Sequence, residues 1–271
     1  MGNIFNFKRF GMLLLKELKE FPLSYGLSVL SAAGVYVLIM ALAMLNGIDH
    51  PVGIFFRMTM ISLLIVVLMV VVPSKMYGYV NHYKKGIYYT LLPASAFEKM
   101  LSMLIICSVV TGLVSFSILV LTDYLVYALF PCRLAGTLFG EAGSVTFFSS
   151  EIFSVVMFQA CFILGNLYYK KQKIAKTIVF LMFLAVIFGV ISFIIITQIG
   201  EDVVTAFLQS KMGDIPSDVN YFDLKKMNDL SESLRQLPFV RIMALVDYIS
   251  WSVIGIGCWT GSYRLIKTNK Y

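Results

Sequence analysis

Long apolar runs constrain the fold of this chain more than any other feature of its sequence. Six stretches are dominated by Leu, Ile, Val, Phe and Met and are separated by more polar segments, of which residues 200–238 are the longest. A helix needs about 20 apolar residues to cross the hydrocarbon core of a bilayer. Each run meets or approaches that length, so we predict six membrane-spanning helices at residues 22–45, 57–79, 94–130, 145–168, 174–199 and 239–262.

Composition excludes a water-soluble domain. Hydrophobic residues make up 59% of the 271 residues and charged residues only 14%, and the mean hydropathy is +0.85. A soluble domain carries about a quarter charged residues. We therefore predict an all-α membrane protein with a single transmembrane domain over residues 1–271. The net charge of +7 is attributed to membrane topology, and no nucleic-acid partner is predicted.

The basic residues predict the orientation of the spans. Most of them lie in residues 1–21, in the loops after the second and fourth spans and in the C-terminal tail, which all fall on one side. Because loops on the cytoplasmic side carry an excess of Lys and Arg, both termini are predicted to be cytoplasmic. An even number of spans agrees with this orientation.

The segment before the first span has its own periodicity. Apolar residues recur every three or four positions over residues 1–21 and are separated by Lys, Arg and Glu. This pattern predicts an amphipathic helix that lies in the cytoplasmic interface. Pro22 suits the first turn of a separate spanning helix. The apolar residues that define the face are Ile4, Phe7, Phe10, Leu14, Leu18 and Phe21.

The segment between the fifth and sixth spans is also patterned. Residues 200–238 contain apolar residues at helical spacing with a break at Gly213 to Pro216. This spacing predicts two short external helices that pack on the outer leaflet, and a solvated loop is the alternative interpretation.

The polar stretch from Tyr77 to Lys99 lies between the second and third spans on the predicted cytoplasmic side. Its first part has room for a short helix that ends before Pro93, because proline disfavours helix at the preceding residue. Tyr and Lys there fit a segment held at the lipid headgroups, or a helix that docks on a cytoplasmic protein. The candidate contact residues are Tyr83, Lys84, Lys85, Tyr88, Tyr89 and Leu92.

A Ser-x-x-Glu pattern follows this break. Ser95 and Glu98 stand directly before an apolar run, which is typical of a capping box that fixes the first turn of a helix. The pattern predicts where the third span begins.

Few residues suit chemistry on this chain. Asp123 and Asp247 lie near or within spans, and an acid there usually faces the bundle interior or water. For Asp123 we favour a carboxylate at the outer interface over a proton relay. The four cysteines and two histidines show no metal or disulfide spacing, and no P-loop is present. We therefore predict no metal, no cofactor and no catalytic residue on this chain.

The layout resembles that of type-2 ABC exporter permeases. The segment Leu91-Leu92-Pro93-Ala94-Ser95 with Glu98-Lys99 looks like the leucine-proline-x-serine and glutamate-lysine segment of bacterial members. The resemblance implies a bacterial inner-membrane protein that forms a dimer with itself or a sibling permease. It also implies a separate ATPase subunit that binds ATP and magnesium.

In that family the short helix, here Tyr83–Leu92, is the coupling helix that contacts the ATPase, and residues 1–21 are the elbow helix. The resemblance implies alternating access driven by ATP, with the external helices of residues 200–238 at the outer exit. Two other functions fit the sequence: a membrane anchor or sensor subunit that binds a cytoplasmic partner, and a proton-coupled secondary transporter that uses Asp123 or Asp247.

Overall fold

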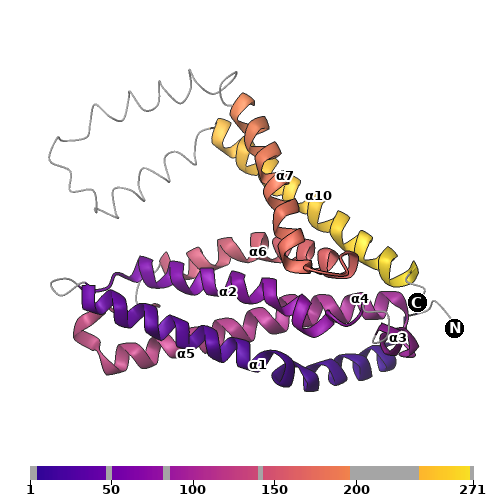
Figure 1. The fold of residues 1–271 in the computed structure, drawn as a ribbon. Helices are drawn as coiled ribbons and strands as arrows, with labels where there is room; N and C mark the ends of the chain where they lie inside the picture. Colours follow the sequence, from indigo (N-terminus) through magenta and orange to yellow (C-terminus); the bar gives the residue numbers. More distant parts are fainter. Residues whose placement is uncertain (1–4, 47–50, 82–85, 140–142, 196–237, 269–271) are drawn as a thin grey trace. The chain divides into compact units, whose positions relative to one another are not determined.

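The computed structural model describes residues 5–46, 51–81, 86–139, 143–195 and 238–268. Within these ranges the structure is built from helices, and the backbone bridge between Val52 and Leu134 is the non-helical pairing. Figure 1 labels the helices. They are α1 (Phe7–Asn46), α2 (Ile54–Tyr77), α3 (Gly86–Leu91), α4 (Ala96–Leu104), the π-helical segment η1 (Ile105–Val110), α5 (Thr111–Leu129), the short η2 (Pro131–Arg133), α6 (Gly143–Tyr168), α7 (Lys173–Ile195) and α10 (Pro238–Thr268).

Among the described residues, four helices are long and apolar enough to cross a membrane. They are Phe7–Leu45, Ile54–Tyr77, Ala96–Leu129 and Lys173–Val190, and a shorter apolar helix covers Ile152–Tyr168. The prediction of an all-α membrane protein is therefore confirmed at this level. The predicted count of six spans goes further than these four helices, and the predicted external helices of residues 200–238 fall, apart from Pro238, outside the described residues.

The chain divides into two compact units. The first contains residues 1–177 and 254–271, and the second contains residues 178–253. The expectation of one transmembrane domain thus stays a prediction. In the second unit, the described side chains of α7 are mainly apolar and exposed, among them Val179, Met182 and Val186. Helices with apolar residues on their outer surface suit a bilayer rather than water.

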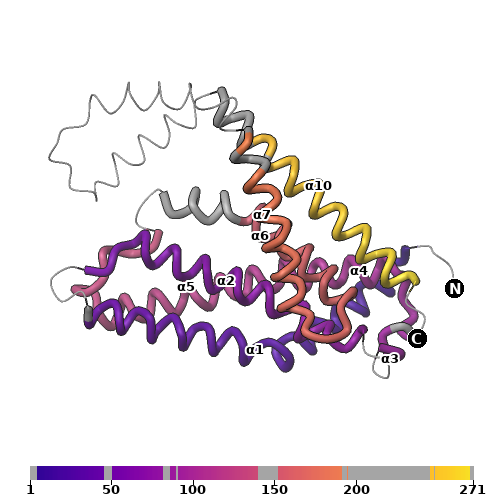
Figure 2. The backbone as a smooth tube through the Cα atoms, turned by 45° about the horizontal axis from the view of Figure 1, so that its top comes forward, coloured from indigo at the N-terminus to yellow at the C-terminus, as the bar shows by residue number. Residues whose placement is uncertain are grey.

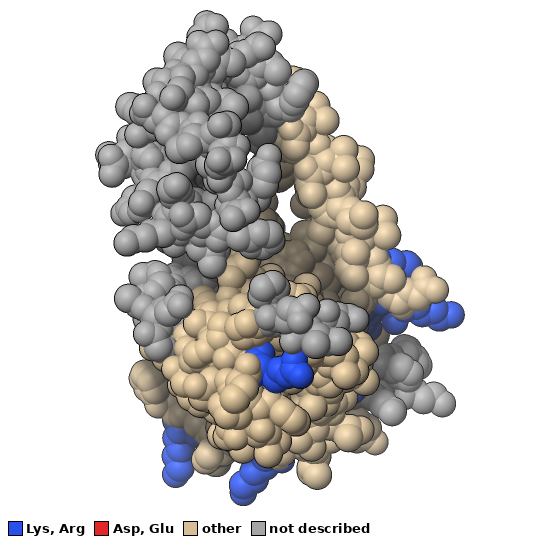
Figure 3. Space-filling view, turned by 90° about the vertical axis from the view of Figure 1, so that its left-hand side faces the viewer, with Lys and Arg blue, Asp and Glu red and all other residues tan. Residues whose placement is uncertain are grey.

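The first unit is a bundle in which α1, α2 and α5 lie side by side, as Figures 1 and 2 both show. One stripe of α1 is buried and includes Tyr25, Val29 and Tyr36, whereas Leu23, Leu27 and Leu30 are exposed. The buried stripe packs on Ile61, Leu64 and Leu68 of α2. In the view of Figure 3 the described surface is mainly uncharged, with Lys and Arg in small separate groups.

Helix α1 corrects one predicted boundary. The sequence predicted a separate interfacial helix over residues 1–21 and a span from Pro22, but α1 is continuous from Phe7 to Asn46 with Pro22 inside it. Proline has no N–H for the carbonyl four residues earlier and tends to bend a helix; Figure 1 shows α1 bent along its length. At 1.5 Å per residue, its 40 residues extend about 60 Å.

The third predicted span is also irregular. It was predicted as one helix over residues 94–130, and it begins at Ala96 and ends at Leu129 with a π-helical segment from Ile105 to Val110. A π-helical turn places an extra residue in the helix and leaves a backbone carbonyl without its usual partner.

Close packing of α6 and α7 explains one glycine. A Cβ atom on Gly165 would lie 1.9 Å from Oγ1 of Thr177, so no side chain fits there. The turn between these helices contains Gln172 with a positive φ of 51°.

Candidate functional site

We define the basic end of the first unit as the end where α1, α4 and α7 begin and α2 and α6 end. Side chains tie these helix ends together. Asn81 Nδ2 donates to the carbonyl of Leu167 at 2.8 Å, and Lys173 Nζ donates to the carbonyl of Gly78 at 2.7 Å. The segment predicted to dock on a partner lies at this end, next to helix ends that are held together by hydrogen bonds.

The predicted capping box is present at the start of α4. Glu98 N donates to Ser95 Oγ at 3.2 Å, and Ser95 N donates to Glu98 Oε2 at 2.7 Å. The Ser95 backbone is extended, as a residue that precedes a helix should be. The two bonds satisfy backbone donors that the first turn leaves without partners.

Glu98 also holds the start of α1, which the sequence did not reveal. Its Oε1 accepts from the backbone N–H of Asn6 at 2.8 Å and from Nη2 of Arg9 at 3.1 Å, and Glu98 is fully buried. Asn6 in turn caps α1, since its Oδ1 accepts from the N–H of Lys8 at 2.9 Å. One carboxylate therefore joins the first turns of two helices that are about 90 residues apart in sequence.

Lys99 holds α3 in the same way. Its Nζ donates to the carbonyl of Tyr89 at 2.8 Å and lies 5.4 Å from the centre of the Tyr89 ring. A cation near the last carbonyls of a helix is favourable. Consecutive residues of a helix point about 100° apart, so Glu98 and Lys99 can reach α1 and α3, respectively, from one turn of α4.

The short helix predicted over Tyr83–Leu92 corresponds to α3, which the structure describes from Gly86 to Leu91; residues 83–85 lie outside the described residues and Leu92 follows the helix. Its side chains divide into two groups. Tyr89 is 2% exposed and its ring packs at 6.4 Å from the Tyr77 ring and 6.2 Å from the Tyr79 ring. In contrast, Tyr88 is 74% exposed and Leu91 is 71% exposed. The helix is anchored by Tyr89 and presents the preceding tyrosine, Tyr88, to the outside.

The predicted contact residues therefore separate. Tyr88 is on the surface, Leu92 is half-buried, and Tyr89 is an interior anchor that is not available to a partner. Leu91 was missed, although its place three residues after Tyr88 puts both on one helical face. Tyr83, Lys84 and Lys85 lie outside the described residues.

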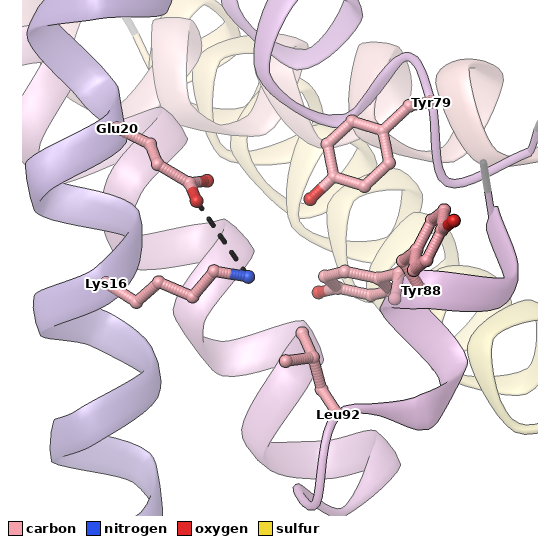
Figure 4. Close-up of a pocket in the computed structure, with 6 residues that line it drawn as sticks. Lys16, Glu20, Tyr79, Tyr88 and Leu92 are labelled. Atoms are coloured by element: carbon pink, nitrogen blue, oxygen red, sulfur yellow. Dashed lines mark ion pairs between the residues drawn. The ribbon is translucent and has the colours of Figure 1, made fainter.

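An open pocket of about 290 Å³ separates α1 from α3. Lys16 Nζ and Glu20 Oε1 form an ion pair of 3.9 Å on its α1 side. Burial and the nearby carboxylates of Glu20 and Glu17 raise the pKa of Tyr79 to about 12. Figure 4 shows the ion pair facing the opposite wall, and the pocket is lined by Lys16, Glu20, Tyr79, Tyr88, Tyr89 and Leu92.

A second buried carboxylate lies near this end. Glu17 is 4% exposed, and its Oε2 accepts from the hydroxyl of Tyr77 at 2.7 Å and from the hydroxyl of Ser102. The sequence contained a signal for this position, because Glu17 is four residues from both Leu13 and Phe21 and so shares their buried face. The cluster connects α1 with α2 and α4.

Asp123 lies at the opposite end. The prediction of a carboxylate at the outer interface stays a prediction, and the structure adds that Asp123 is 1% exposed and paired. Arg57 Nε donates to its Oδ1 at 2.9 Å, Arg57 Nη2 donates to its Oδ2, and the Tyr36 hydroxyl donates to Oδ1. Arg57 also donates to the carbonyl of Gly136 at 2.8 Å. An acid inside a membrane bundle is stabilised by such a partner.

The pairing of Arg57 with Asp123 could have been inferred from their positions along the two helices. It stands three residues after the start of α2, and Asp123 stands six residues before the end of α5. Antiparallel neighbours place these two positions at a similar level. Asp247, the other predicted polar residue, belongs to the helix α10, but its side chain is outside the described part of the structure.

Comparison with known proteins adds no assignment. No protein-family model, no curated protein and no solved structure matches this chain.

Proposed function

We propose that this chain is the transmembrane permease subunit of an ATP-driven exporter that works with a separate ATPase subunit. The observation that carries the proposal is the division of α3 into a buried and an exposed side. This helix is anchored from inside by Tyr89 and presents Tyr88 and Leu91 outward. An exposed aromatic and an exposed leucine on one face suit a groove on a soluble protein.

The bonds of α3 support a mechanical role. Lys99 joins α3 to the first turn of α4, and the neighbouring Glu98 joins that turn to α1. A displacement of α3 by a partner would therefore act on the helices that follow and precede it. In an exporter, ATP-driven closure of two ATPase subunits would supply the displacement, and the spans would alternate between inward-open and outward-open states.

The remaining parts of the proposal concern topology. We place the basic end in the cytoplasm of a bacterium with both termini, in accordance with the excess of Lys and Arg there. The permease would have six spans, of which α6 and α10 supply two, and would form a dimer with itself or a sibling. Residues 200–238 would lie outside.

The test is purification of the tagged chain from its native membranes in mild detergent. We expect a subunit with a P-loop to co-purify and the complex to hydrolyse MgATP. The Tyr88→Ala, Leu91→Ala double variant should lose the ATPase subunit while its spans remain inserted. Tyr168→Ala is the matched control, because Tyr168 is 65% exposed and is the last residue of α6 at the same end.

Two results would contradict the proposal. Unchanged ATPase association and transport in the double variant would remove the docking role of α3. A stable partner without a P-loop would favour a membrane anchor or sensor subunit instead. Transport that responds to pH in the parent and loses this response in Asp247→Asn would favour the secondary transporter.

A further inference from the structure

Pro73 creates an irregularity in the middle of the bundle. Proline has no N–H, so the carbonyl of Met69, four residues earlier on α2, lacks its usual helical partner. Gln159 of α6 approaches this carbonyl, with 3.4 Å between its Nε2 and Met69 O. Asn166, two turns further along α6, donates to the carbonyl of Pro73 at 2.8 Å.

The π-helical segment creates a second irregularity at the same level. The N–H of Thr111 bonds to the carbonyls of Ile106 and Ser108 and not to that of Cys107. Gln159 Nε2 donates to the Cys107 carbonyl, and Gln159 Oε1 accepts from Ser108 Oγ at 2.6 Å. Gln159 is fully buried, and both its nitrogen and its oxygen are used.

A cavity of about 490 Å³ opens beside this glutamine, between α2, the η1–α5 region and α6. Its walls are Ile, Leu, Val, Met and Phe side chains with Gly112, and none of the lining side chains carries a charge. Ser62 and Ser108 supply its hydroxyls, and Ser108 donates to Gln159. Residues at its mouth are exposed: Val109 is 53%, Leu113 is 64% and Ile152 is 62% exposed.

We propose that this cavity holds a hydrocarbon chain of a membrane lipid. Its volume falls in the range of about 300–1,000 Å³ that is common for ligand pockets, and an uncharged apolar lining favours a ligand without polar groups. It lies along the middle of α2 and of Ala96–Leu129, which are candidate spans, so a bilayer would supply acyl chains at its mouth.

The dimensions favour a lipid chain over a second copy of this protein. From Ser62 to Met69 the cavity follows about 10 Å of helix at 1.5 Å per residue. A volume of about 490 Å³ over that length gives a cross-section of about 50 Å². A helix with side chains is about 10–12 Å wide and needs a cross-section of about 80 Å² or more. A single chain fits, and a helix does not.

The bound chain would touch both irregularities, because Met69 and Ser108 line the cavity. It would fill the space beside the two carbonyls that Gln159 reaches. The inference requires only that α2, α5 and α6 lie in a bilayer, so it does not depend on the exporter assignment.

The test uses a phospholipid with a diazirine near the end of one acyl chain. The purified full-length protein is mixed with this lipid in detergent, irradiated and digested, and the adducts are mapped by mass spectrometry. We expect adducts to concentrate on the peptides that line the cavity, residues 62–69 and 108–116. Exposed apolar residues elsewhere, such as Leu121, should carry few.

Variants that place a larger side chain in the cavity provide the decisive comparison. Val155→Phe and, as an independent second variant, Ile65→Trp should lower the adducts in the cavity about tenfold, since losing contacts to about two methylene groups has that effect. Leu63→Trp is the control, because Leu63 is on α2 but does not line the cavity and is 53% exposed. Folding of each variant is checked by gel filtration.

Two outcomes would overturn the inference. Adducts spread in proportion to surface exposure, or unaffected by both filling variants, would show that the cavity retains no chain. Efficient disulfide formation between two copies of Val109→Cys, with no lipid adduct in the parent protein, would show that a second copy covers the mouth.

Discussion

Arg57 donates to both carboxylate oxygens of Asp123 in the interior of the first unit, where the two side chains are 0% and 1% exposed. Tyr36 completes the network from α1. The network of Tyr36, Arg57 and Asp123 thus joins three helices at the end opposite to α3.

We predict that Asp123→Asn destabilises the protein by about 3–5 kcal/mol, because it leaves the buried Arg57 charge without a counter-charge. A double variant, Arg57→Met with Asp123→Leu, should recover most of this loss. Thermal unfolding in detergent provides the measurement. Glu20→Gln is the control, since it removes an exposed ion pair worth less than about 1 kcal/mol. If Asp123→Asn and Glu20→Gln destabilised the protein equally, the prediction would be contradicted.

Mutation can separate the capping box of α4 from the bonds by which Glu98 holds the start of α1. Ser95→Ala should cost about 1 kcal/mol by removing one cap, and hydrogen exchange should rise only at the start of α4. Glu98→Ala also removes the acceptor for Asn6 and Arg9. Exchange should therefore rise in the first turns of both helices. If the two variants gave the same exchange pattern, Glu98 would not hold α1.

Two cysteines provide a test of the packing of α6 against the last part of α10. The sulfur atoms of Cys161 and Cys258 are 3.6 Å apart, and a disulfide requires about 2.05 Å. Mild oxidation of the membranes should therefore yield a bond between them after a small movement. Peptide mapping should find this pair, whereas Cys107 and Cys132 should remain alkylatable after unfolding. Oxidised protein that lacks the 161–258 peptide would show that Cys161 and Cys258 are not neighbours.

Gln159→Leu should loosen two helices at once. The variant removes donors from the carbonyls of Met69 and Cys107, and a buried polar group without its partner costs about 1–3 kcal/mol. We expect faster hydrogen exchange around residues 69–77 and 105–112. Asn166→Leu is the matched control and should affect only the region of Pro73. No change around residues 105–112 in Gln159→Leu would contradict the role given to this side chain.

Helix positions and the start of α4 could be predicted from the sequence, because they depend on residues that are close together in the chain. The apolar runs gave the positions of the long helices, and Ser95 with Glu98 gave the start of α4, since the capping box needs only four consecutive residues. Helix boundaries were less predictable. Pro22 is compatible with a first turn, but the buried face of Leu13, Glu17 and Phe21 continues to Tyr25 without interruption, so packing keeps one helix across the proline.

Long-range partners were not readable, because they depend on which helices become neighbours. Asp123 was recognised as a polar residue in an apolar run, but its burial follows from the approach of α2 with Arg57. The exposed and the anchoring residues of α3 could not be distinguished from the sequence for a similar reason. Tyr88 and Tyr89 are adjacent and alike in sequence, and only the packing of Tyr77 and Tyr79 distinguishes the anchor from the exposed residue.

Helix α1 links the two polar networks. Near its start, Arg9 is bonded to Glu98, and 27 positions later, Tyr36 is bonded to Asp123. At 1.5 Å per residue these contacts lie about 40 Å apart along one continuous helix, which exceeds the thickness of the hydrocarbon core of about 30 Å. The two networks therefore hold α1 at two distant points, and a shift of the whole helix along its axis by one turn would break both of them.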